Sequence, residues 1–287
     1  MTTTTLRLTD VDLVYDVHGP LPTPDGRPPL VLIGQPMDAG GFASLVAELT
    51  DTTTVTYDPR GLGRSTRSDG RVDHDPAVHA DDVAALIDAL AAGPVDLFAS
   101  SGGAVTALAL VARHPTSVRT LIAHEPPLLC LLDDADAALR AEALVGERYQ
   151  ASGWAAGMAS FLAMTAWQGP FTEDYFDQPD PDPAQFGMPA GDDGTRDDPL
   201  LSGRSAAVTA FRPDVDALHA APTRIVIAVG EESLDVLTGR TALATAALLG
   251  QTAAVFPSHH GGFMGGEHGY AGQPAAFAAR LREVLAS

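Results

Sequence analysis

Short apolar segments alternate with amphipathic ones along most of the chain. The wholly apolar run at residues 29–33 is typical of a strand that is buried on both faces of a sheet, and residues 95–99 and 118–123 are again short apolar segments. Residues 80–92 instead carry apolar side chains at helical spacing. The alternation predicts the α/β class, with a mostly parallel sheet flanked by helices. The predicted strands are residues 4–9, 11–18, 29–33, 53–57, 95–99, 118–123, 223–229 and 253–256, and the predicted helices are residues 40–50, 80–92, 104–112, 237–249 and 274–286.

The regular alternation stops between residues 128 and 215. This segment contains two helical stretches, at 134–150 and 154–167, and a region rich in Pro, Asp and Gly, but no clear strand. The pattern predicts a helical insertion at one end of the sheet. Residues 1–127 and 216–287 would then form the core domain, and residues 128–215 a helical cap.

Composition limits the classes of partner. The chain has 287 residues, of which 45% are hydrophobic, and this is enough for one large domain with its own core. Thirty-seven acidic residues outnumber seventeen basic ones, all of them arginine, and give a formal net charge of −20. Nucleic acids and anionic membranes attract cationic surfaces, so we expect neither as a partner.

Three features of the sequence indicate the cellular compartment of the protein. The single Cys130 excludes an internal disulfide framework and cysteine-based metal clusters. The N-terminus lacks a basic region followed by an apolar one. No apolar run approaches the ~20 residues of a membrane-spanning helix. We therefore expect a cytoplasmic protein that does not span a membrane.

Residues 99–103, Ala-Ser-Ser-Gly-Gly, lie between a predicted strand and a predicted helix. A serine on such a sharp turn forms a nucleophile elbow, in which the hydroxyl is exposed and can be activated by a base. The strained turn needs small residues two positions before and two after the nucleophile. Ser101 has Ala and Gly there, whereas the bulky Phe98 precedes Ser100 by two positions. The turn therefore predicts Ser101 as the nucleophile.

A serine nucleophile needs two backbone N–H groups that stabilise the oxyanion formed from the substrate carbonyl. We expect one from Gly102, which follows the serine at the positive end of the predicted helix. The other is expected from the loop after residues 29–33. Pro36 has no N–H, so Gln35 is the predicted donor, with Met37 as the alternative.

Four segments of the chain resemble the α/β-hydrolase superfamily and occur in its chain order. The resemblance covers nearly all of the chain. It implies an α/β-hydrolase fold with an eight-stranded sheet, a cap domain over residues 128–215, and a structural role for the Asp-Pro-Arg-Gly-x-Gly-x-Ser loop. The four segments are Ile33-Gly-Gln-Pro36, Tyr57-Asp-Pro-Arg-Gly-Leu-Gly-Arg-Ser65, Ala99-Ser-Ser-Gly-Gly103 and Phe256-Pro-Ser-His-His-Gly-Gly262.

The resemblance implies that the base is a histidine on the loop after the last strand. His259 and His260 both lie there, and His268 is close to them. The common His-Gly pattern of the superfamily favours His260, which directly precedes the Gly-Gly pair. His259 remains the alternative.

The resemblance offers two places for the acid that orients the histidine. Many relatives carry it after the seventh strand, where this chain has Glu232 and where Ser233 takes the usual aspartate position. In haloalkane dehalogenases and certain mycotoxin lactone hydrolases it lies at the end of the sixth strand, where this chain has Glu125. Two prolines follow and would stop that strand at the catalytic edge. We therefore expect Glu125 to accept the N–H of His260.

Aromatic residues concentrate in the predicted insertion, where seven of the seventeen fall within residues 154–186. They predict an apolar lid over the serine that accepts a hydrophobic acyl, alcohol or lactone group, although some of them must form the cap's own core. The predicted substrate-contacting residues are Trp154, Met164, Trp167 and Phe186.

These residues together predict a serine hydrolase that cleaves a hydrophobic carboxylic ester or lactone through an acyl-enzyme, without cofactor or metal. Ser101 stands where haloalkane dehalogenases and epoxide hydrolases of this fold have an aspartate. The pairs His259-His260 and Glu267-His268 are too few and wrongly spaced for a helix-borne zinc site. The alternatives are carbon–carbon bond hydrolysis or perhydrolysis on the same triad, and a non-catalytic ligand receptor. The sequence carries no signal about the oligomeric state.

Overall fold

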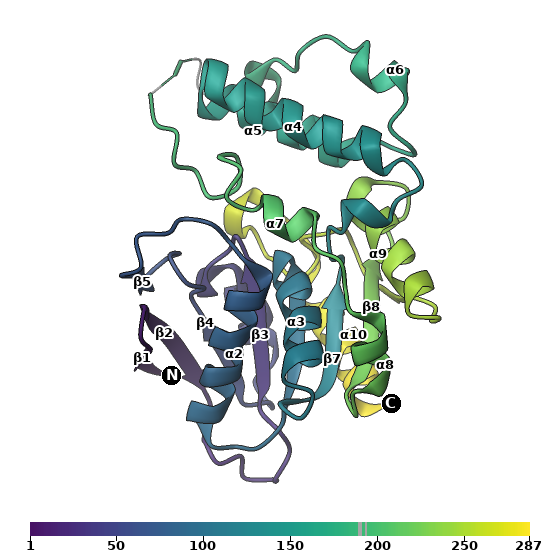
Figure 1. Ribbon diagram of the computed structural model, residues 1–287. Coiled ribbons are helices and arrows are strands. Elements are labelled where there is room, and N and C mark those ends of the chain that lie inside the picture. The colour runs from purple at the N-terminus through teal and green to yellow at the C-terminus, as the bar shows by residue number, and fades with distance from the viewer. Residues whose placement is uncertain (189–190, 193) are drawn as a thin grey trace.

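A central sheet carries helices on both faces, and a further helical layer lies beyond one end of the sheet (Figure 1). The computed structural model describes residues 1–188, 191–192 and 194–287. Its strands are β1 (Thr2–Arg7), β2 (Val11–His18), β3 (Leu30–Gln35), β4 (Thr54–Tyr57), β5 (Thr66–Arg67), β6 (Val95–Ser101), β7 (Val118–His124), β8 (Arg224–Gly230) and β9 (Ala254–Phe256). Its α-helices are α1 (Ala43–Glu48), α2 (Pro76–Leu90), α3 (Gly102–Arg113), α4 (Ala135–Ser152), α5 (Trp154–Ala166), α6 (Glu173–Phe176), α7 (Ala206–Thr209), α8 (Val215–Ala220), α9 (Leu237–Leu248) and α10 (Pro274–Ala286).

The sheet is mostly parallel, and this confirms the predicted α/β class. Among the described residues, eight strands follow the order β1-β2-β4-β3-β6-β7-β8-β9, and the short β5 pairs with β2. Strand β2 is antiparallel to its neighbours, whereas every pairing from β4 to β9 along this order is parallel. Strand β3 is buried along its whole length, because helices cover both faces of a parallel sheet.

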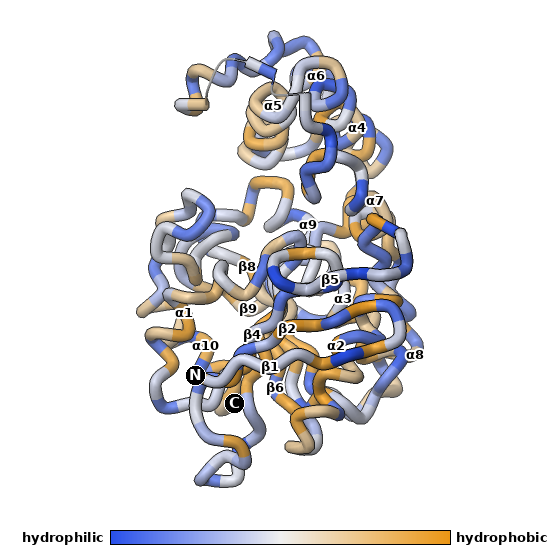
Figure 2. The backbone as a smooth tube through the Cα atoms, turned by 90° about the vertical axis from the view of Figure 1, so that its left-hand side faces the viewer, coloured by the Kyte–Doolittle hydropathy of each residue, from blue (hydrophilic) through white to orange (hydrophobic). Residues whose placement is uncertain are grey.

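The helices form one layer on each face of the sheet, as the two perpendicular views agree (Figures 1 and 2). Helices α2, α3, α8 and α9 contribute to a core cluster that contains Val31 and Leu97 of the sheet. Helices α1 and α10 contribute to a second cluster on the opposite face, around Phe98 and Phe277. None of the helices in the described ranges is long and apolar enough to cross a membrane.

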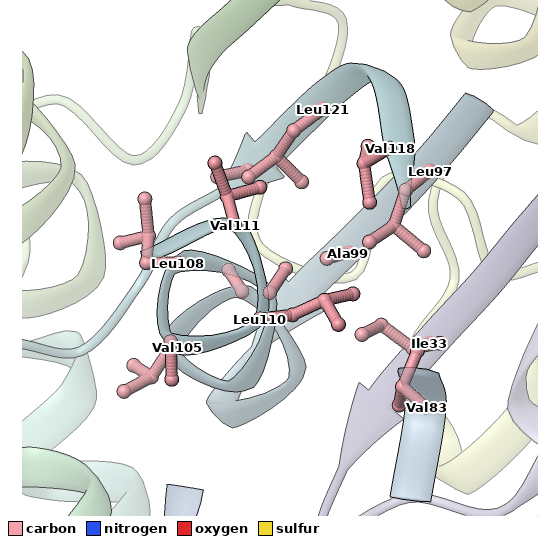
Figure 3. Packing of buried hydrophobic residues seen from close by; sticks show 14 of the residues in the cluster. Ile33, Val83, Leu97, Ala99, Val105, Leu108, Leu110, Val111, Val118 and Leu121 are labelled. Carbon is pink, nitrogen blue, oxygen red and sulfur yellow. The ribbon is translucent and has the colours of Figure 1, made fainter. Parts of the chain in front are cut away.

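Helix α3 packs very closely against the middle of the sheet. Ala99 lies among the apolar side chains between α3 and its neighbouring strands (Figure 3). A Cβ atom added to Gly103 would lie only 2.6 Å from the carbonyl oxygen of Ile33. The small residues on either side of Ser101 thus let the start of α3 approach β3 and β6.

Helix α2 begins four residues before the predicted start. Asp75 precedes it, and its carboxylate accepts a hydrogen bond from the backbone N–H of Ala77 at 2.9 Å. Pro76 occupies the first helical turn, where its missing N–H costs no hydrogen bond. The cap therefore extends the helix beyond the apolar pattern that predicted it.

The part of the chain from α4 to α7 lies beyond the carboxyl ends of the parallel strands, whereas α8 returns to the face of the sheet (Figures 1 and 2). The two predicted helices form as α4 and α5, and a cluster that includes Tyr149 and Leu201 packs around them. The described part of this segment contains no strand, and α6 and α7 add short helices that the pattern did not predict. Residues 189–190 and 193 lie outside the described residues, and the division into core and cap stays a prediction.

Two glycine replacements, one in the closely packed α3 and one in the open surroundings of α4, should change the free energy of unfolding in opposite directions. Gly103→Ala should lower the free energy of unfolding by about 1–3 kcal/mol, because the new methyl group meets the Ile33 carbonyl. Gly146→Ala, in α4, should raise it by about 0.5–1 kcal/mol, because its methyl group comes no closer than 3.9 Å to a neighbour and alanine favours the helix. Urea unfolding of both variants measures the two changes. A Gly103→Ala protein as stable as the wild type would contradict the packing described here.

Candidate active site

The register of the parallel strands brings the predicted site residues to one edge of the sheet. Gln35 at the end of β3 pairs with Ser101 at the end of β6. In the next pairing, Ser100 lies opposite His124, the last residue of β7. The carboxyl ends of β8 and β9 continue this edge. In open parallel sheets, ligands bind at this edge.

Ser101 occupies a strained bend between β6 and α3. Its backbone has φ 57° and ψ −130°, a conformation that residues with a side chain rarely adopt. Ser101 is partly exposed, whereas the neighbouring Ser100 is only 2% exposed and its Oγ lies 3.1 Å from Nδ1 of His124. The bend therefore presents the hydroxyl-bearing residue that the sequence predicted and buries the other one.

The two predicted oxyanion donors are neighbours. Gly102 is the first residue of α3, where the backbone N–H groups have no partner within the helix. A Cβ atom added to it would lie 2.9 Å from the carbonyl oxygen of Gln35. Thr106 donates to Oε1 of Gln35 at 3.3 Å, which fixes that side chain below α3.

The loop after β3 is held by the loop that resembled the superfamily's Asp-Pro-Arg-Gly pattern. One carboxylate oxygen of Asp58 accepts the backbone N–H of Ala39 at 2.9 Å, and the other accepts the backbone N–H of Arg64 at 2.7 Å. The Arg64 side chain also pairs with the same carboxylate. Asp58 therefore ties the segment that follows Gln35 to the end of β4.

Glu125 and His260 form a direct hydrogen bond. Nδ1 of His260 lies 2.7 Å from Oε2 of Glu125, and Oε1 accepts the backbone N–H of Gly230 at 2.8 Å. Glu125 is fully buried, and its φ of 47° turns the chain sharply out of β7. The acid at the end of β7 thus meets the histidine of the loop after β9 across the end of β8.

The charge state of Glu125 follows from these contacts. Burial acts to raise the pKa of the carboxyl group. The hydrogen bond from His260, the neighbouring imidazoles and a hydrogen bond from Thr238 outweigh burial and hold this pKa below its usual value. Glu125 is therefore an ionised acceptor at neutral pH, and Nδ1 of His260 donates to it.

The alternative residues do not join this group. Nδ1 of His259 accepts the backbone N–H of Gly261 at 3.0 Å, and its ring lies beside Tyr270. Glu232 is exposed, and its backbone N–H donates to the carbonyl of Ser258. Of the candidate pairs, only Glu125 and His260 are in contact.

The third member of the predicted triad, Ser101, is not hydrogen-bonded to the pair formed by Glu125 and His260. Within the described ranges, no hydrogen bond joins Ser101 Oγ to His260. Nδ1 of His260 is engaged by Glu125, so Nε2 is the nitrogen that remains for the serine. In enzymes without bound substrate such contacts are often long, and they tighten in the complex.

The insertion reaches this edge through α7. Cγ1 of Val208 lies 3.3 Å from the point that a Cβ atom on Gly102 would occupy. His74, on the core side, anchors the start of α7: its backbone N–H donates to the carbonyl of Arg204, and its ring bonds Ser205, both at 2.9 Å. The insertion is therefore in contact with the core beside the predicted oxyanion donors.

The four predicted substrate-contacting residues have different surroundings. Nε1 of Trp154 donates to Asp198 at 3.0 Å, and Met164 is buried in the cluster around α4 and α5. Trp167 packs edge-to-face against Tyr175 and donates to a backbone carbonyl. Phe186 is 42% exposed. Contact between these residues and a substrate stays a prediction.

Sequence reasoning missed two groups around the acid. His124 is fully buried directly before Glu125, and Thr238 of α9 bonds the carboxylate. The signal for His124 was present, because a histidine directly follows the apolar residues 121–123 at the end of the strand. Thr238 is more than 100 residues away in the sequence, and no local pattern connects it to Glu125.

A family model described as the alpha/beta hydrolase fold matches residues 28–160. This range contains the elbow, both oxyanion candidates and Glu125, and the order of elements agrees with it. The chain has the α/β-hydrolase fold. This fold explains why the site residues lie at the carboxyl edge of the sheet.

Individual members of the superfamily are similar to this chain to different extents. An uncharacterized hydrolase, YraK, of Bacillus subtilis is 36% identical over 129 residues, which span 45% of this chain and 46% of the relative. A thermophilic esterase from Thermogutta terrifontis is 23% identical, with a TM-score of 0.63, and the match covers 100% of this chain and 98% of that one. Est816, described as degrading N-acyl homoserine lactones, is 20% identical, with a TM-score of 0.62 and coverage of 98% and 99%. At these identities the two solved structures are evidence of a shared fold.

A separate cleft lies at the amino ends of the strands, away from the superfamily's site. It has a volume of about 880 Å³ and includes Leu30, Thr54 and Asp96, at the starts of β3, β4 and β6. Each of its three arginines is paired with an aspartate. Its charges are therefore already satisfied within the protein.

The buried His124 predicts a dependence of stability on pH. Burial lowers the pKa of His124 to about 4, whereas the unfolded chain takes up this proton near pH 6.5. The unfolded state binds more protons between these values, so the free energy of unfolding falls as the pH falls from 6.5 to 4. The share of His124 in this loss is roughly 3 kcal/mol.

His124→Phe removes that share, so its stability should fall less than that of the wild type between pH 7 and pH 4.5. Urea unfolding at a series of pH values measures the difference. Burial also lowers the pKa values of His74 and His79, so both proteins keep some acid sensitivity. Identical losses in the two proteins would contradict the buried neutral state of His124.

Proposed function

We propose that the chain is a cofactor-independent serine hydrolase that cleaves hydrophobic carboxylic esters or lactones. The observation that carries the proposal is the 2.7 Å bond between Glu125 and His260 at the sheet edge that also holds the strained Ser101. A serine, an acid and an imidazole in this chain order are the parts of a nucleophilic triad. Because the curated relative is matched over less than half of its length, the activity is proposed from the site itself.

The Glu125 contact selects the tautomer of His260 that a general base needs. Nδ1–H donates to the ionised carboxylate, so the lone pair lies on Nε2. Nε2 takes the proton of Ser101 as the hydroxyl oxygen attacks the substrate carbonyl. The carboxylate stabilises the resulting imidazolium, and burial strengthens that interaction because water does not screen it.

The proposed reaction has two steps, acylation of Ser101 and hydrolysis of the acyl-enzyme. Attack by Ser101 forms a tetrahedral oxyanion, for which the backbone N–H groups of Gly102 and Gln35 are the proposed donors. The carbon–oxygen bond of the ester breaks, and the leaving alkoxide takes the proton from His260. Water attacks the acyl-enzyme with His260 again as base, which releases the carboxylic acid and restores Ser101. With a lactone, both products are one hydroxy acid.

The proposed substrate class combines a carbonyl that a serine can attack with an apolar body. The contact of Val208 with the Gly102 region supports a lid made by residues 128–215, and the aromatic side chains of that segment support an apolar binding surface. Trp154, Met164, Trp167 and Phe186 remain its proposed contacts. The esterase and the lactone-degrading protein of similar fold support carboxylic esters and lactones as the two substrate types to test.

Replacement of the serine tests the nucleophile. The wild type should hydrolyse members of a panel of p-nitrophenyl esters and lactones of graded size, and a fluorophosphonate probe should label it. Ser101→Ala should lose both reactions, because no hydroxyl remains on the strained bend. Ser117→Ala, in the loop before β7 at the opposite edge of the sheet, is the matched control and should retain both. A folded wild type that the probe does not label would favour the non-catalytic receptor.

Replacement of the acid tests the assignment of Glu125. Glu125→Gln keeps the size of the side chain but removes the charge that stabilises the imidazolium, so kcat should fall by about a thousandfold or more. Glu232→Gln, on the exposed alternative, should change kcat less than twofold. Steady-state kinetics on the best ester of the panel measures both. Full activity in the Glu125 variant, or a comparable loss in the Glu232 variant, would refute the assignment.

A further inference from the structure

A fully buried imidazole, that of His124, directly precedes the proposed acid in the chain. His124 is fully buried, and the rings of Phe98, Phe256, Phe263 and Phe277 surround it with centroids 5.4–6.3 Å away. Its ring also stacks on that of His260, at 5.9 Å between centroids and an interplanar angle of 20°. An apolar residue would fill this position at no desolvation cost, so a polar ring here calls for a polar function.

The two ring nitrogens of His124 have different surroundings. Nδ1 lies 3.1 Å from Oγ of Ser100. Nε2 lies 3.8 Å from Oε1 of Glu125 and has no hydrogen-bond partner within the part of the chain that the structure describes. The two adjacent serines of the elbow therefore differ in their partners. Ser100 contacts His124, whereas Ser101 ends β6 at the sheet edge where Glu125 binds His260.

Electrostatics selects the tautomer of His124. If Nδ1 carried the proton, the lone pair of Nε2 would face the ionised Glu125 carboxylate at 3.8 Å, which is repulsive. If Nε2 carries it, the N–H dipole points at the carboxylate, and the Ser100 hydroxyl donates to Nδ1. The second arrangement gives an attractive interaction at both nitrogens.

We propose that Ser100 and His124 form a positioning pair for the acid: the Ser100 hydroxyl fixes the tautomer of His124, and His124 Nε2–H holds the Glu125 carboxylate in line with His260. The inference rests on the proposed function, because it assigns these residues to the support of its triad. Neither residue touches substrate, and both act through Glu125.

The pair works because His124 stays neutral. Burial is the largest effect and lowers the pKa of His124 to about 4. Of the charged or titratable groups that face the ring, Glu125 acts to raise this pKa, and His260 and His259 act to lower it. A charged His124 would compete with His260 for the carboxylate and would repel the imidazolium formed during the reaction. A neutral N–H donor stabilises the carboxylate without either effect.

Three substitutions at one position separate the roles of the two nitrogens. His124→Phe keeps an aromatic ring among the four phenylalanines but removes both nitrogens. His124→Gln keeps a donor close to the position of Nε2, and His124→Asn keeps a polar group close to that of Nδ1. We expect kcat on the best ester to fall about tenfold in the Phe and Asn variants with KM unchanged, and the Gln variant to recover most of it.

Ser100→Ala tests the other half of the pair. It should lower kcat by a smaller factor than His124→Phe, because the tautomer is no longer fixed but the donor remains. In the double variant Ser100→Ala/His124→Phe the loss should equal that of His124→Phe alone, since Ser100 acts only through His124. Multiplicative losses would contradict the pair.

A second readout is independent of turnover. The proton that His260 Nδ1 shares with the Glu125 carboxylate should give a strongly deshielded proton NMR signal in the wild type. The signal should weaken or shift in the Phe and Asn variants and be retained in the Gln variant, with thermal unfolding confirming that each protein is folded. A merely structural His124 would leave both the signal and kcat unchanged in the Phe variant, and this result would overturn the inference.

The two readouts also separate this inference from the proposed function. If the wild type neither hydrolyses the ester panel nor reacts with the fluorophosphonate probe, the proposed function fails, while the NMR signal still decides whether His124 holds the carboxylate. If the wild type is active but kcat and the signal are the same in the wild type, Phe and Gln proteins, the positioning pair fails and the proposed function stands.

Discussion

The structure depends most on the buried carboxylate of Glu125. An isolated charge in this position would be very unfavourable, so every neighbouring element must supply a group that stabilises it. The loop after β9 supplies His260, the end of β8 supplies a backbone N–H, and α9 supplies Thr238. Satisfying one charge therefore fixes the positions of three segments, each of which lies more than 100 residues from Glu125 in the sequence.

A second constraint comes from the strained serine. The backbone of Ser101 is held in an unfavourable region only because the elements around it leave no alternative. Gly103 lets α3 touch β3, and buried residues of β6 lock the strand below the bend. The energy of core packing thus maintains the bend, and the parallel register places it next to Gln35.

Local patterns were sufficient for the main strands and the longer helices but not for the contacts between them. Apolar runs predicted the strands, and the small residues around Ser101 distinguished it from Ser100. The choice of Glu125 over Glu232 needed the resemblance to a family, because both glutamates follow a strand and only the sheet register decides which one meets His260. The environment of the aromatic insertion residues was beyond prediction, since α4 and α5 bury side chains against each other and against segments distant in sequence. The contacts of His124 could not be predicted, because they are made with residues from other strands and loops of the fold.

The central claim is that the oxygen of Ser101 becomes acylated. The most direct measurement is mass spectrometry of the protein quenched within the first turnover on a p-nitrophenyl ester, with fragmentation of the peptide that contains both serines. The account predicts the added mass of one acyl group on Ser101, which disappears as hydrolysis proceeds. An acyl group on Ser100, or hydrolysis without any covalent intermediate, would contradict it.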